Sequence, residues 1–453
     1  MKEDAIEINV KLKMKSPVFF NSLSKLGKRL YMPKGIIFQS SQSTQHANKF
    51  NASIGIAIEN IGFDGTNEIQ AENLGPMVLS SLKSFFNDLE PNQIFNYAPP
   101  SGDMKVREFW QKKIIRQNPA LSSIDQISLP VITGGLTHGL SIFSELFLNP
   151  NDTIVMADKM WENYNLMFNV KYQTKFIKYP LFKEDLSGFN LEAFENALKK
   201  VHKKKIIVLF NFPNNPTGYT ATDNEMNAIT DILKKFANKG KEIIVICDDA
   251  YYGLFYDAKI YPGSLFSKIT NLHKNIVGVK VDGISKEDYA WGLRMGFITF
   301  TDGLTNKEAF TVLEQKATAS IRSSISCASR ISQSIFGKVM NSEKYQIEKN
   351  EKFDILQNRS NKVKEIVNKE EFKKYWDVYP FNSGYFMCLR IKDVSAEVVR
   401  THALFKHGLG TIAFGNDLRV AFSCIEEKNI ENVFKIIAKS IDEIKSGDIV
   451  SSL

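Results

Sequence analysis

Short apolar runs rich in β-branched residues recur through the middle of the chain, each followed by polar or glycine-rich residues and then by a stretch with helical spacing. Strands that are apolar throughout and separated by helical stretches are typical of a largely parallel sheet covered by helices on both faces. Right-handed crossovers connect such strands. The pattern therefore predicts an α/β fold. The predicted strands are residues 153–156, 206–210, 243–246, 276–279 and 295–300.

The last third of the chain has a different pattern. Residues 341–369 are charged, have helical spacing and contain neither glycine nor proline, which predicts a long connecting helix. Residues 381–387 and 418–423 have the pattern of strands in a second, smaller α+β unit. A chain of 453 residues also exceeds the size at which one hydrophobic core stops growing. We therefore expect a large domain of residues 72–345 and a small domain of residues 1–71 and 346–453.

Composition excludes several classes of protein. The net charge is +8, but the basic residues are spread along the chain and mixed with 50 acidic ones. The densest cluster, residues 199–205, is expected to be a solvated helix end rather than a nucleic-acid site. No segment approaches the ~20 apolar residues of a membrane span, and residues 1–16 lack the apolar core of a signal peptide. The four cysteines show no paired spacing. We expect a soluble, cytoplasmic protein that binds neither nucleic acid nor membrane.

Three polar motifs follow the predicted strands in order. Residues 215–218 are Asn-Pro-Thr-Gly, residues 248–251 are Asp-Asp-Ala-Tyr, and residues 285–286 are Ser-Lys, with Arg294 shortly after them. Each motif alone is weak, because Asn-Pro is common in turns and Ser-Lys arises by chance in a lysine-rich chain. In open parallel sheets, however, ligands bind beyond the carboxyl ends of the strands, which is where these motifs lie.

Together the motifs resemble those of class I aminotransferases of the aspartate and aromatic type, which are fold type I enzymes dependent on pyridoxal phosphate. The resemblance covers residues 51–423. It implies a large domain with a mostly parallel seven-stranded sheet, a smaller α+β domain and pyridoxal 5'-phosphate as cofactor. The implied reaction moves an amino group from an L-amino acid of the aspartate or aromatic class to a 2-oxo acid such as 2-oxoglutarate. It also implies a homodimer in which Tyr97 reaches the phosphate of the neighbouring subunit.

The resemblance assigns roles around the cofactor ring. Lys286 matches the lysine that holds the cofactor aldehyde covalently and, once substrate displaces it, moves a proton from the substrate Cα. Asp248 matches the carboxylate that pairs with the pyridine nitrogen and keeps it protonated. Asp249 is the less suitable partner, since alternation along a strand turns it to the opposite face. Asn215 and Tyr251 match the pair that hydrogen-bonds the phenolic oxygen.

The phosphate group has its own set of predicted contacts. Gly134, Gly135 and Leu136 lead into a helical stretch whose N-terminus exposes backbone N–H groups. Ser285 and Arg294 add a hydroxyl and a bidentate donor for the same dianion. The chain departs from the family two positions before the Ser-Lys pair, where a glycine replaces a frequent phosphate-binding serine, so that contact is not carried over.

The resemblance also assigns residues to the substrate. Arg419 matches the arginine that receives the α-carboxylate, for which a planar guanidinium is suited. Gly55 resembles the small residue that lets the backbone approach the same carboxylate, and Asn215 is expected beside it. Trp161 falls where an aromatic ring stacks on the cofactor. Taken singly, the tryptophan would be interpreted as a core residue and Gly-Gly at the cradle as loop punctuation.

Two other functions use related chemistry or a related fold. A pyridoxal-phosphate-dependent carbon–sulfur β-lyase is the alternative function, because the fold does not choose among the fates of the substrate. Such an enzyme would release ammonia and pyruvate without consuming an oxo acid. A ligand-sensing regulator would need a DNA-binding domain ahead of the enzyme-like part, and the residues before Gly55 are too few for one.

Two features carry no assigned role in the reaction. Residues 35–42 are a hypothetical lid that could hold the groups that recognise the substrate side chain. The six histidines show no metal-ligand spacing, so no metal site is predicted. His402 and His407 lie in a helical pattern and are expected to be structural or solvated.

Overall fold

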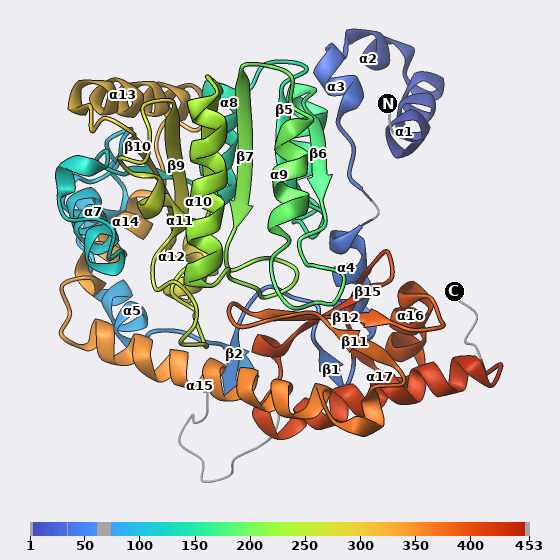
Figure 1. Ribbon diagram of the computed structural model, residues 1–453. Coiled ribbons are helices and arrows are strands. Elements are labelled where there is room, and N and C mark those ends of the chain that lie inside the picture. Colours follow the sequence, from blue (N-terminus) through green and yellow to red (C-terminus); the bar gives the residue numbers. More distant parts are fainter. Residues whose placement is uncertain (1–2, 34, 61–73, 449–453) are drawn as a thin grey trace.

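The computed structural model describes residues 3–33, 35–60 and 74–448. Its largest unit is a seven-stranded sheet of order β4-β10-β9-β8-β7-β5-β6 (Figure 1). Strand β10 is antiparallel to both of its neighbours, and the other pairs are parallel, so the predicted α/β fold with a mostly parallel sheet is confirmed. The strands are β4 (Val131–Thr133), β5 (Thr153–Ala157), β6 (Lys175–Tyr179), β7 (Lys205–Asn211), β8 (Glu242–Asp248), β9 (Ile276–Gly283) and β10 (Gly296–Asp302).

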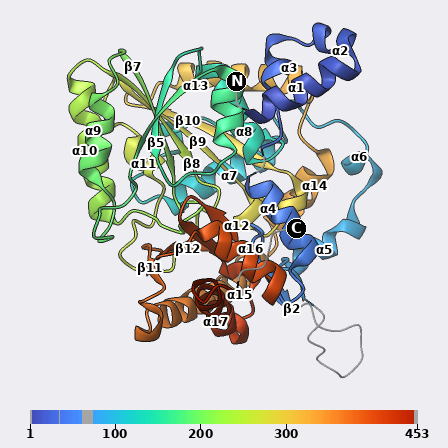
Figure 2. The same cartoon turned by 90° about the vertical axis from the view of Figure 1, so that its right-hand side faces the viewer.

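Helices cover both faces of this sheet (Figures 1 and 2). The alternation of side chains along β7 explains how one strand serves two cores. Ile207 and Leu209 pack with α8 and α13, whereas Ile206, Val208 and Phe210 pack on the face covered by α9, α10 and α11. The helices are α8 (Leu136–Phe147), α13 (Lys307–Ser324), α9 (Leu191–Lys199), α10 (Asp223–Asn238) and α11 (Leu265–Ile269).

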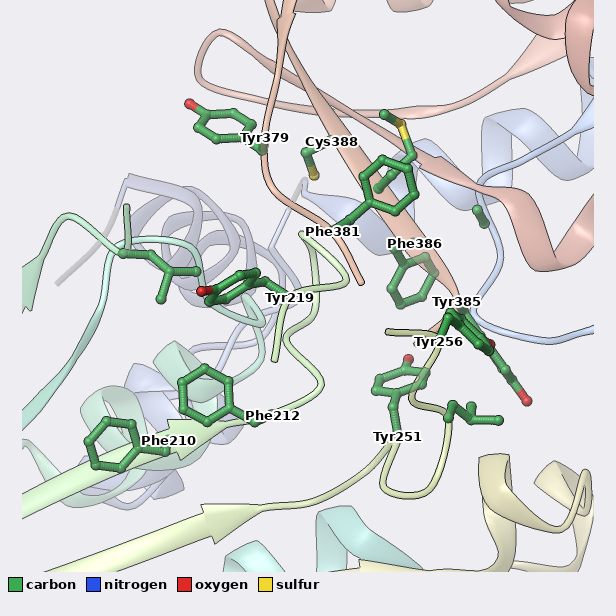
Figure 3. Packing of buried hydrophobic residues seen from close by; sticks show 14 of the residues in the cluster. Phe210, Phe212, Tyr219, Tyr251, Tyr256, Tyr379, Phe381, Tyr385, Phe386 and Cys388 are labelled. Atoms are coloured by element: carbon green, nitrogen blue, oxygen red, sulfur yellow. The ribbon is translucent and has the colours of Figure 1, made fainter. Parts of the chain in front are cut away.

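A second sheet of four strands, in the order β11-β12-β15-β14, lies beyond the carboxyl ends of the large sheet (Figure 1). The predicted long helix over residues 341–369 is confirmed as α15. The hydrophobic core continues from Phe210 of β7 to Phe386 of β12, so the two sheets share packing (Figure 3). The elements are β11 (Trp376–Val378), β12 (Phe386–Ile391), β14 (Ile412–Phe414), β15 (Asp417–Ala421), α15 (Lys344–Val367), α16 (Ala396–His407) and α17 (Ile430–Lys445).

The predicted strand over residues 381–387 is wrong at residues 381–385. The strand begins only at Phe386, because Gly384 has a positive φ of 71° and the side chain of Asn382 is hydrogen-bonded to the loop after β7. Asn382 accepts a hydrogen bond from the Thr220 amide at 2.8 Å and donates one to the Thr220 carbonyl. These residues therefore join the small sheet to the loop after β7 instead of extending β12.

The N-terminal helices α1 (Glu3–Lys15), α2 (Pro17–Ser22) and α3 (Lys25–Arg29) form a separate cluster (Figure 1). Arg29 anchors this cluster, since its guanidinium donates to the carbonyls of Val170 and Lys171. The remaining elements are α4 (Ile36–His46), α5 (Ser80–Ser84), α6 (Pro91–Ile94), α7 (Met104–Gln117), α12 (Ile284–Glu287), α14 (Arg330–Val339), β1 (Phe50–Asn51), β2 (Ile58–Asn60), β3 (Leu74–Pro76) and β13 (Leu409–Gly410).

The predicted division into two domains stays a prediction, and its boundary between residues 71 and 72 lies outside the described residues. Of the helices in the described part of the chain, none is both long and apolar enough to cross a membrane.

Candidate active site

A cavity of about 570 Å³ opens where the carboxyl ends of β7 and β8 meet the small sheet. It collects residues from both sheets, from the start of α8 and from the N-terminal helix α4. Nine of the residues singled out in the sequence line it. These are Gly55, Leu136, Trp161, Asn215, Asp248, Tyr251, Lys286, Arg294 and Arg419.

Lys286 lies on α12, directly after β9, with its side chain toward this cavity. Removal from bulk water lowers the pKa of its ammonium to about 8, although Asp248 favours the charged form and partly offsets this effect. The hydroxyl of Tyr385 donates to the Lys286 carbonyl at 3.0 Å, which fixes the short helix against the small sheet. Lys286 therefore presents an amine that loses its proton close to neutral pH.

Asp248 is the last residue of β8 and is 3% exposed. Burial raises the pKa of its carboxyl to about 6, against the opposing effects of a hydrogen bond from Tyr164 and of the Lys286 charge. The Tyr164 hydroxyl donates to the Asp248 carboxylate at 2.5 Å. Asp249 lies on the other side of the strand, where it forms an ion pair with buried Lys280, as alternation predicts.

The predicted phosphate cradle is the turn from β4 into α8. Gly135 has a positive φ of 91°, and a Cβ at this position would lie 2.6 Å from the guanidinium of Arg294, so the glycine allows a close approach. The buried hydroxyl of Ser285 has no hydrogen-bond partner among the described residues. The Gly134 amide is already used, since it donates to His138 Nδ1 at 3.0 Å. The His138 and Gly139 amides donate to the Gly135 carbonyl, so of the first four amides of α8 those of Leu136 and Thr137 are the ones that face away from an acceptor in the helix.

Arg419 lies on β15, is 3% exposed and lines the same cavity. Its guanidinium donates to the Asn215 side chain at 3.0 Å and to the Ser53 carbonyl at 2.7 Å, and it lies 4.3 Å from the centre of the Phe386 ring. Its buried Nε has no partner among the described residues. A Cβ on Gly55 would meet only ordinary protein contacts at 3.4 Å or more, and the approach of the substrate carboxylate to this residue stays a prediction.

The aromatic residues of the site differ in their surroundings. Tyr251 is 5% exposed and packs edge to face against Phe386 (Figure 3), and burial raises the pKa of its hydroxyl. Trp161 lines the cavity with its ring perpendicular to that of Tyr164. Tyr97 is 89% exposed and does not line the cavity of its own chain.

Sequence reasoning missed several polar residues of the site, among them Tyr164 and Asn211. Tyr164 contacts Asp248 from 84 positions earlier in the chain, and no local pattern marks that contact. Asn211 lines the cavity and accepts a hydrogen bond from the Asn215 amide at 2.7 Å. Asn211 is the polar last residue of an apolar strand, and this position could have identified it from the sequence.

The hypothetical lid at residues 35–42 corresponds to the first part of α4, which forms one wall of the cavity. Ile37, Ser40 and Thr44 face it. The carboxylate of Glu162 accepts a hydrogen bond from the Ile36 amide at 2.9 Å, which places a negative charge at the N-terminus of the helix. The helix is therefore positioned to contact whatever the cavity holds.

The site thus combines a buried carboxylate, a lysine of lowered pKa and a cradle in which the Ser285 hydroxyl has no partner among the described residues. A family model, Aminotransferase class I and II, matches residues 65–437. The chain belongs to this family. As a member of this family, the chain has pyridoxal phosphate as its cofactor. The residues fit it: the unpaired Ser285 hydroxyl, Gly135 and Arg294 suit the phosphate, and Asp248 suits the ring nitrogen.

Individual aminotransferases are similar to this chain over part of its length. The probable N-acetyl-LL-diaminopimelate aminotransferase of Bacillus subtilis is 27% identical over 243 residues, which are 53% of this chain and 54% of that protein. The probable aspartate/prephenate aminotransferase of Aquifex aeolicus is 26% identical over 209 residues, 45% of this chain and 48% of that protein. The chain thus spans about half the length of the curated relatives it matches.

Solved aminotransferase structures share the fold over nearly the whole chain. An aminotransferase from Anaerococcus prevotii has a TM-score of 0.79 and 22% identity, over 92% of this chain and 98% of that one. The aspartate aminotransferase from Saccharomyces cerevisiae cytoplasm has a TM-score of 0.75 and 20% identity, over 94% and 99%. The fold is that of the type I pyridoxal-phosphate aminotransferases, as expected from the sequence.

Proposed function

We propose that this protein is an aminotransferase that moves the amino group of an L-amino acid, of the aspartate or aromatic class, to a 2-oxo acid such as 2-oxoglutarate. The observation that carries the proposal is that Lys286, Asp248 and Arg419 line one and the same cavity. When bound, pyridoxal phosphate supplies an aromatic ring that accepts the electron pair left when a proton leaves the substrate Cα.

The chain's own residues would supply proton transfer and orientation. Lys286 Nζ, with a pKa of about 8, would take the proton from the substrate Cα and give it up at a different carbon, because a proton returned to Cα would leave the amino group on the donor. Arg419 holds the α-carboxylate through its planar guanidinium, and its unpaired Nε is available for that group. Asn215 hydrogen-bonds Arg419 and thereby keeps the guanidinium in place. The hydrogen bond from Tyr164 holds the buried Asp248 carboxylate in place. This carboxylate would balance the positive charge on the ring nitrogen.

The cavity lining bears on the substrate side chain. Among the described residues that line it, the cations are Lys286, Arg294 and Arg419, and the first two belong to the cofactor end. The wall formed by α4 offers the aliphatic Ile37 and the hydroxyl of Ser40. These groups support an aromatic donor more than aspartate, whose second carboxylate needs a further cation.

We also infer a homodimer in which Tyr97 reaches the phosphate end of the neighbouring site. The support is its 89% exposure together with that of Phe95, two residues earlier, which is 81% exposed, because neighbouring exposed apolar side chains mark a surface that a partner can cover. A cytoplasmic location is inferred as well, supported by four cysteines that are free thiols.

The test is the fate of an isotopically labelled amino group. The protein loaded with pyridoxal phosphate is mixed with ¹⁵N-labelled tyrosine, phenylalanine, aspartate or cysteine, together with 2-oxoglutarate. The proposal expects ¹⁵N-glutamate, with the aromatic donors ahead of aspartate. Free ¹⁵N-ammonia and pyruvate from cysteine, independent of 2-oxoglutarate, would instead establish the carbon–sulfur lyase and overturn the proposal.

A further inference from the structure

A cluster of metal-binding side chains lies in the small sheet unit, outside the active-site cavity. His402 and His407 of α16 and Glu443 of α17 bring their donor atoms within 4.8 Å of one another. Both Nε2 atoms approach one carboxylate oxygen, Glu443 Oε2, at 2.8 Å for His402 and 2.6 Å for His407. Two imidazoles and a carboxylate thus converge on one point from two helices.

The geometry explains why sequence spacing did not reveal this cluster. Five residues of α-helix turn through 500°, so the two rings leave α16 roughly 140° apart. They converge because Glu443 of the neighbouring helix α17 lies between them, 36 positions after His407. Gly408, with a positive φ of 67°, ends α16 immediately after His407 and turns the chain into β13.

The two carboxylate oxygens of Glu443 have different charged neighbours. Lys406 and Lys439 approach Oε1, at 3.5 Å and 3.8 Å. Lys406 is also paired with Asp448, which draws its charge away from the histidines. Oε2 therefore contacts the two imidazoles, and Oε1 contacts the two lysines. Groups around a metal site orient its ligands in the same way.

Burial leaves one side of the cluster open. The side chain of His402 is 1% exposed, whereas those of His407 and Glu443 are 13% and 18% exposed. An ion can therefore enter from solvent and keep one position for water. Three protein ligands of the nitrogen and oxygen type, with a fourth position for water, suit Zn²⁺.

We propose that His402, His407 and Glu443 form a zinc-binding site that links α16 to α17. Tetrahedral zinc with ligands at about 2.0–2.1 Å separates its ligand atoms by roughly 3.3 Å. The present distances of 2.6 and 2.8 Å would have to open by less than 1 Å. Zinc replaces the shared protons, so binding releases protons and is weaker in acid.

A zinc ion here would increase the free energy of unfolding, because it would join two helices that cover the small sheet. Helix α16 also contacts α4, since Arg400 donates to the Gln42 side chain at 3.0 Å. The site thus lies one helix away from the wall of the cavity. Its ligands make no contact with the proposed reaction, and the site is independent of the proposed function.

The test measures zinc binding by the untagged protein loaded with pyridoxal phosphate. Stripped protein competes with a chromogenic chelator for zinc, and thermal unfolding is followed with and without the ion. We expect one tight zinc per chain and a higher unfolding temperature with zinc. His407→Ala and the nearly isosteric Glu443→Gln should each bind zinc at least ~10-fold more weakly and lose the thermal shift. His202→Ala, at an exposed histidine elsewhere, is the matched control and should behave as the wild type.

Circular dichroism and bound cofactor establish that each variant is folded before zinc is added. Equal zinc affinity in wild type and in both folded ligand variants would overturn the proposal, as would wild-type protein that fails to compete with the chelator. If both ligand variants are unfolded, the wild-type stoichiometry and its zinc-dependent unfolding temperature decide the matter.

Discussion

At the residue scale, Lys286 and Asp248, which both line the cavity, have pKa values shifted toward each other. Burial lowers the pKa of Lys286 to about 8 and raises that of Asp248 to about 6. Between these values, Asp248 is ionised and Lys286 still carries its proton. Above pH 8, Lys286 is a neutral amine beside a carboxylate, which is the state able to attack an aldehyde.

The lowered pKa of Lys286 predicts how the rate of covalent pyridoxal phosphate binding by the cofactor-free protein depends on pH. Because the pKa of Lys286 is depressed, the neutral amine is scarce below about pH 8 and grows roughly tenfold per pH unit up to that value. The incorporation rate, followed by absorbance, should rise accordingly and level off above it. A rate that does not change between about pH 6.5 and pH 7.5 would contradict the assigned role of Lys286.

Arg419 allows a second prediction at this scale. Arg419→Lys keeps the charge but loses the planar pair of donors, so the KM for the amino acid should rise about 10- to 100-fold. Affinity for pyridoxal phosphate should hardly change, since the guanidinium donates to Asn215 and Ser53 and not to a residue of the phosphate cradle. Equal losses of amino-acid and cofactor affinity would show that Arg419 acts on the structure of the whole site.

The sequence predicted single residues best where a motif follows a strand. Asp248 ends the strand β8 and Lys286 lies on the short helix that follows β9, and alternation correctly turned Asp249 away. Tyr164 was not predictable, because its contact with Asp248 depends on how distant segments pack. Tyr251 and Trp161 line the cavity, yet their roles toward the cofactor stay predictions.

At the element scale, the joint between the sheets depends on the turn after β7. Gly218 has a positive φ of 72°, and its carbonyl accepts hydrogen bonds from the Asn382 and Ser383 amides. A Cβ at this glycine would lie 1.9 Å from the Phe386 carbonyl oxygen. The turn therefore needs glycine for both its conformation and its packing against β12.

This arrangement predicts the outcome of a matched pair of substitutions. Gly240→Ala meets no atom within 4 Å at a φ of 83°, so it should cost only the strain of about 1 kcal/mol. Gly218→Ala adds a clash with backbone and should lower the free energy of unfolding by about 2–3 kcal/mol more. Chemical denaturation measures both. Equal losses would mean that the close approach between β12 and the turn is not required.

A comparison of the strands also shows which of them can be predicted from the sequence. The five central runs became strands because they are buried on both faces and apolar throughout. Strand β6 was missed because it lies at the edge of the sheet and carries Lys175 and Lys178. Residues 381–385 looked like a strand, but Gly384 and the side chain of Asn382 give them another conformation.

At the scale of the whole molecule, one core cluster reaches from the large sheet to the small one, and the cavity lies along this joint. Family membership and fold could be predicted because the motifs are spread along the chain in a fixed order. The domain boundary and the subunit arrangement depend on contacts between distant surfaces, and they stay predictions.

The dimer proposal gives a test at this scale. In light scattering the protein should have twice the mass of one chain. Tyr97→Phe should keep that mass but weaken binding of pyridoxal phosphate about tenfold, since one hydrogen bond to a charged group is lost. A monomeric wild type whose cofactor affinity equals that of the variant would contradict the role of Tyr97.

The central claim is that Lys286 and Arg419 serve one transamination site, and the visible absorption of the cofactor-loaded protein tests it most directly. The account predicts that L-tyrosine or L-phenylalanine, without any oxo acid, removes the long-wavelength band of the bound cofactor, and that 2-oxoglutarate restores it. Lys286→Ala should fold and lack both changes. A band that persists with every donor while pyruvate forms from L-cysteine, or a Lys286→Ala protein that cycles normally, would contradict the account.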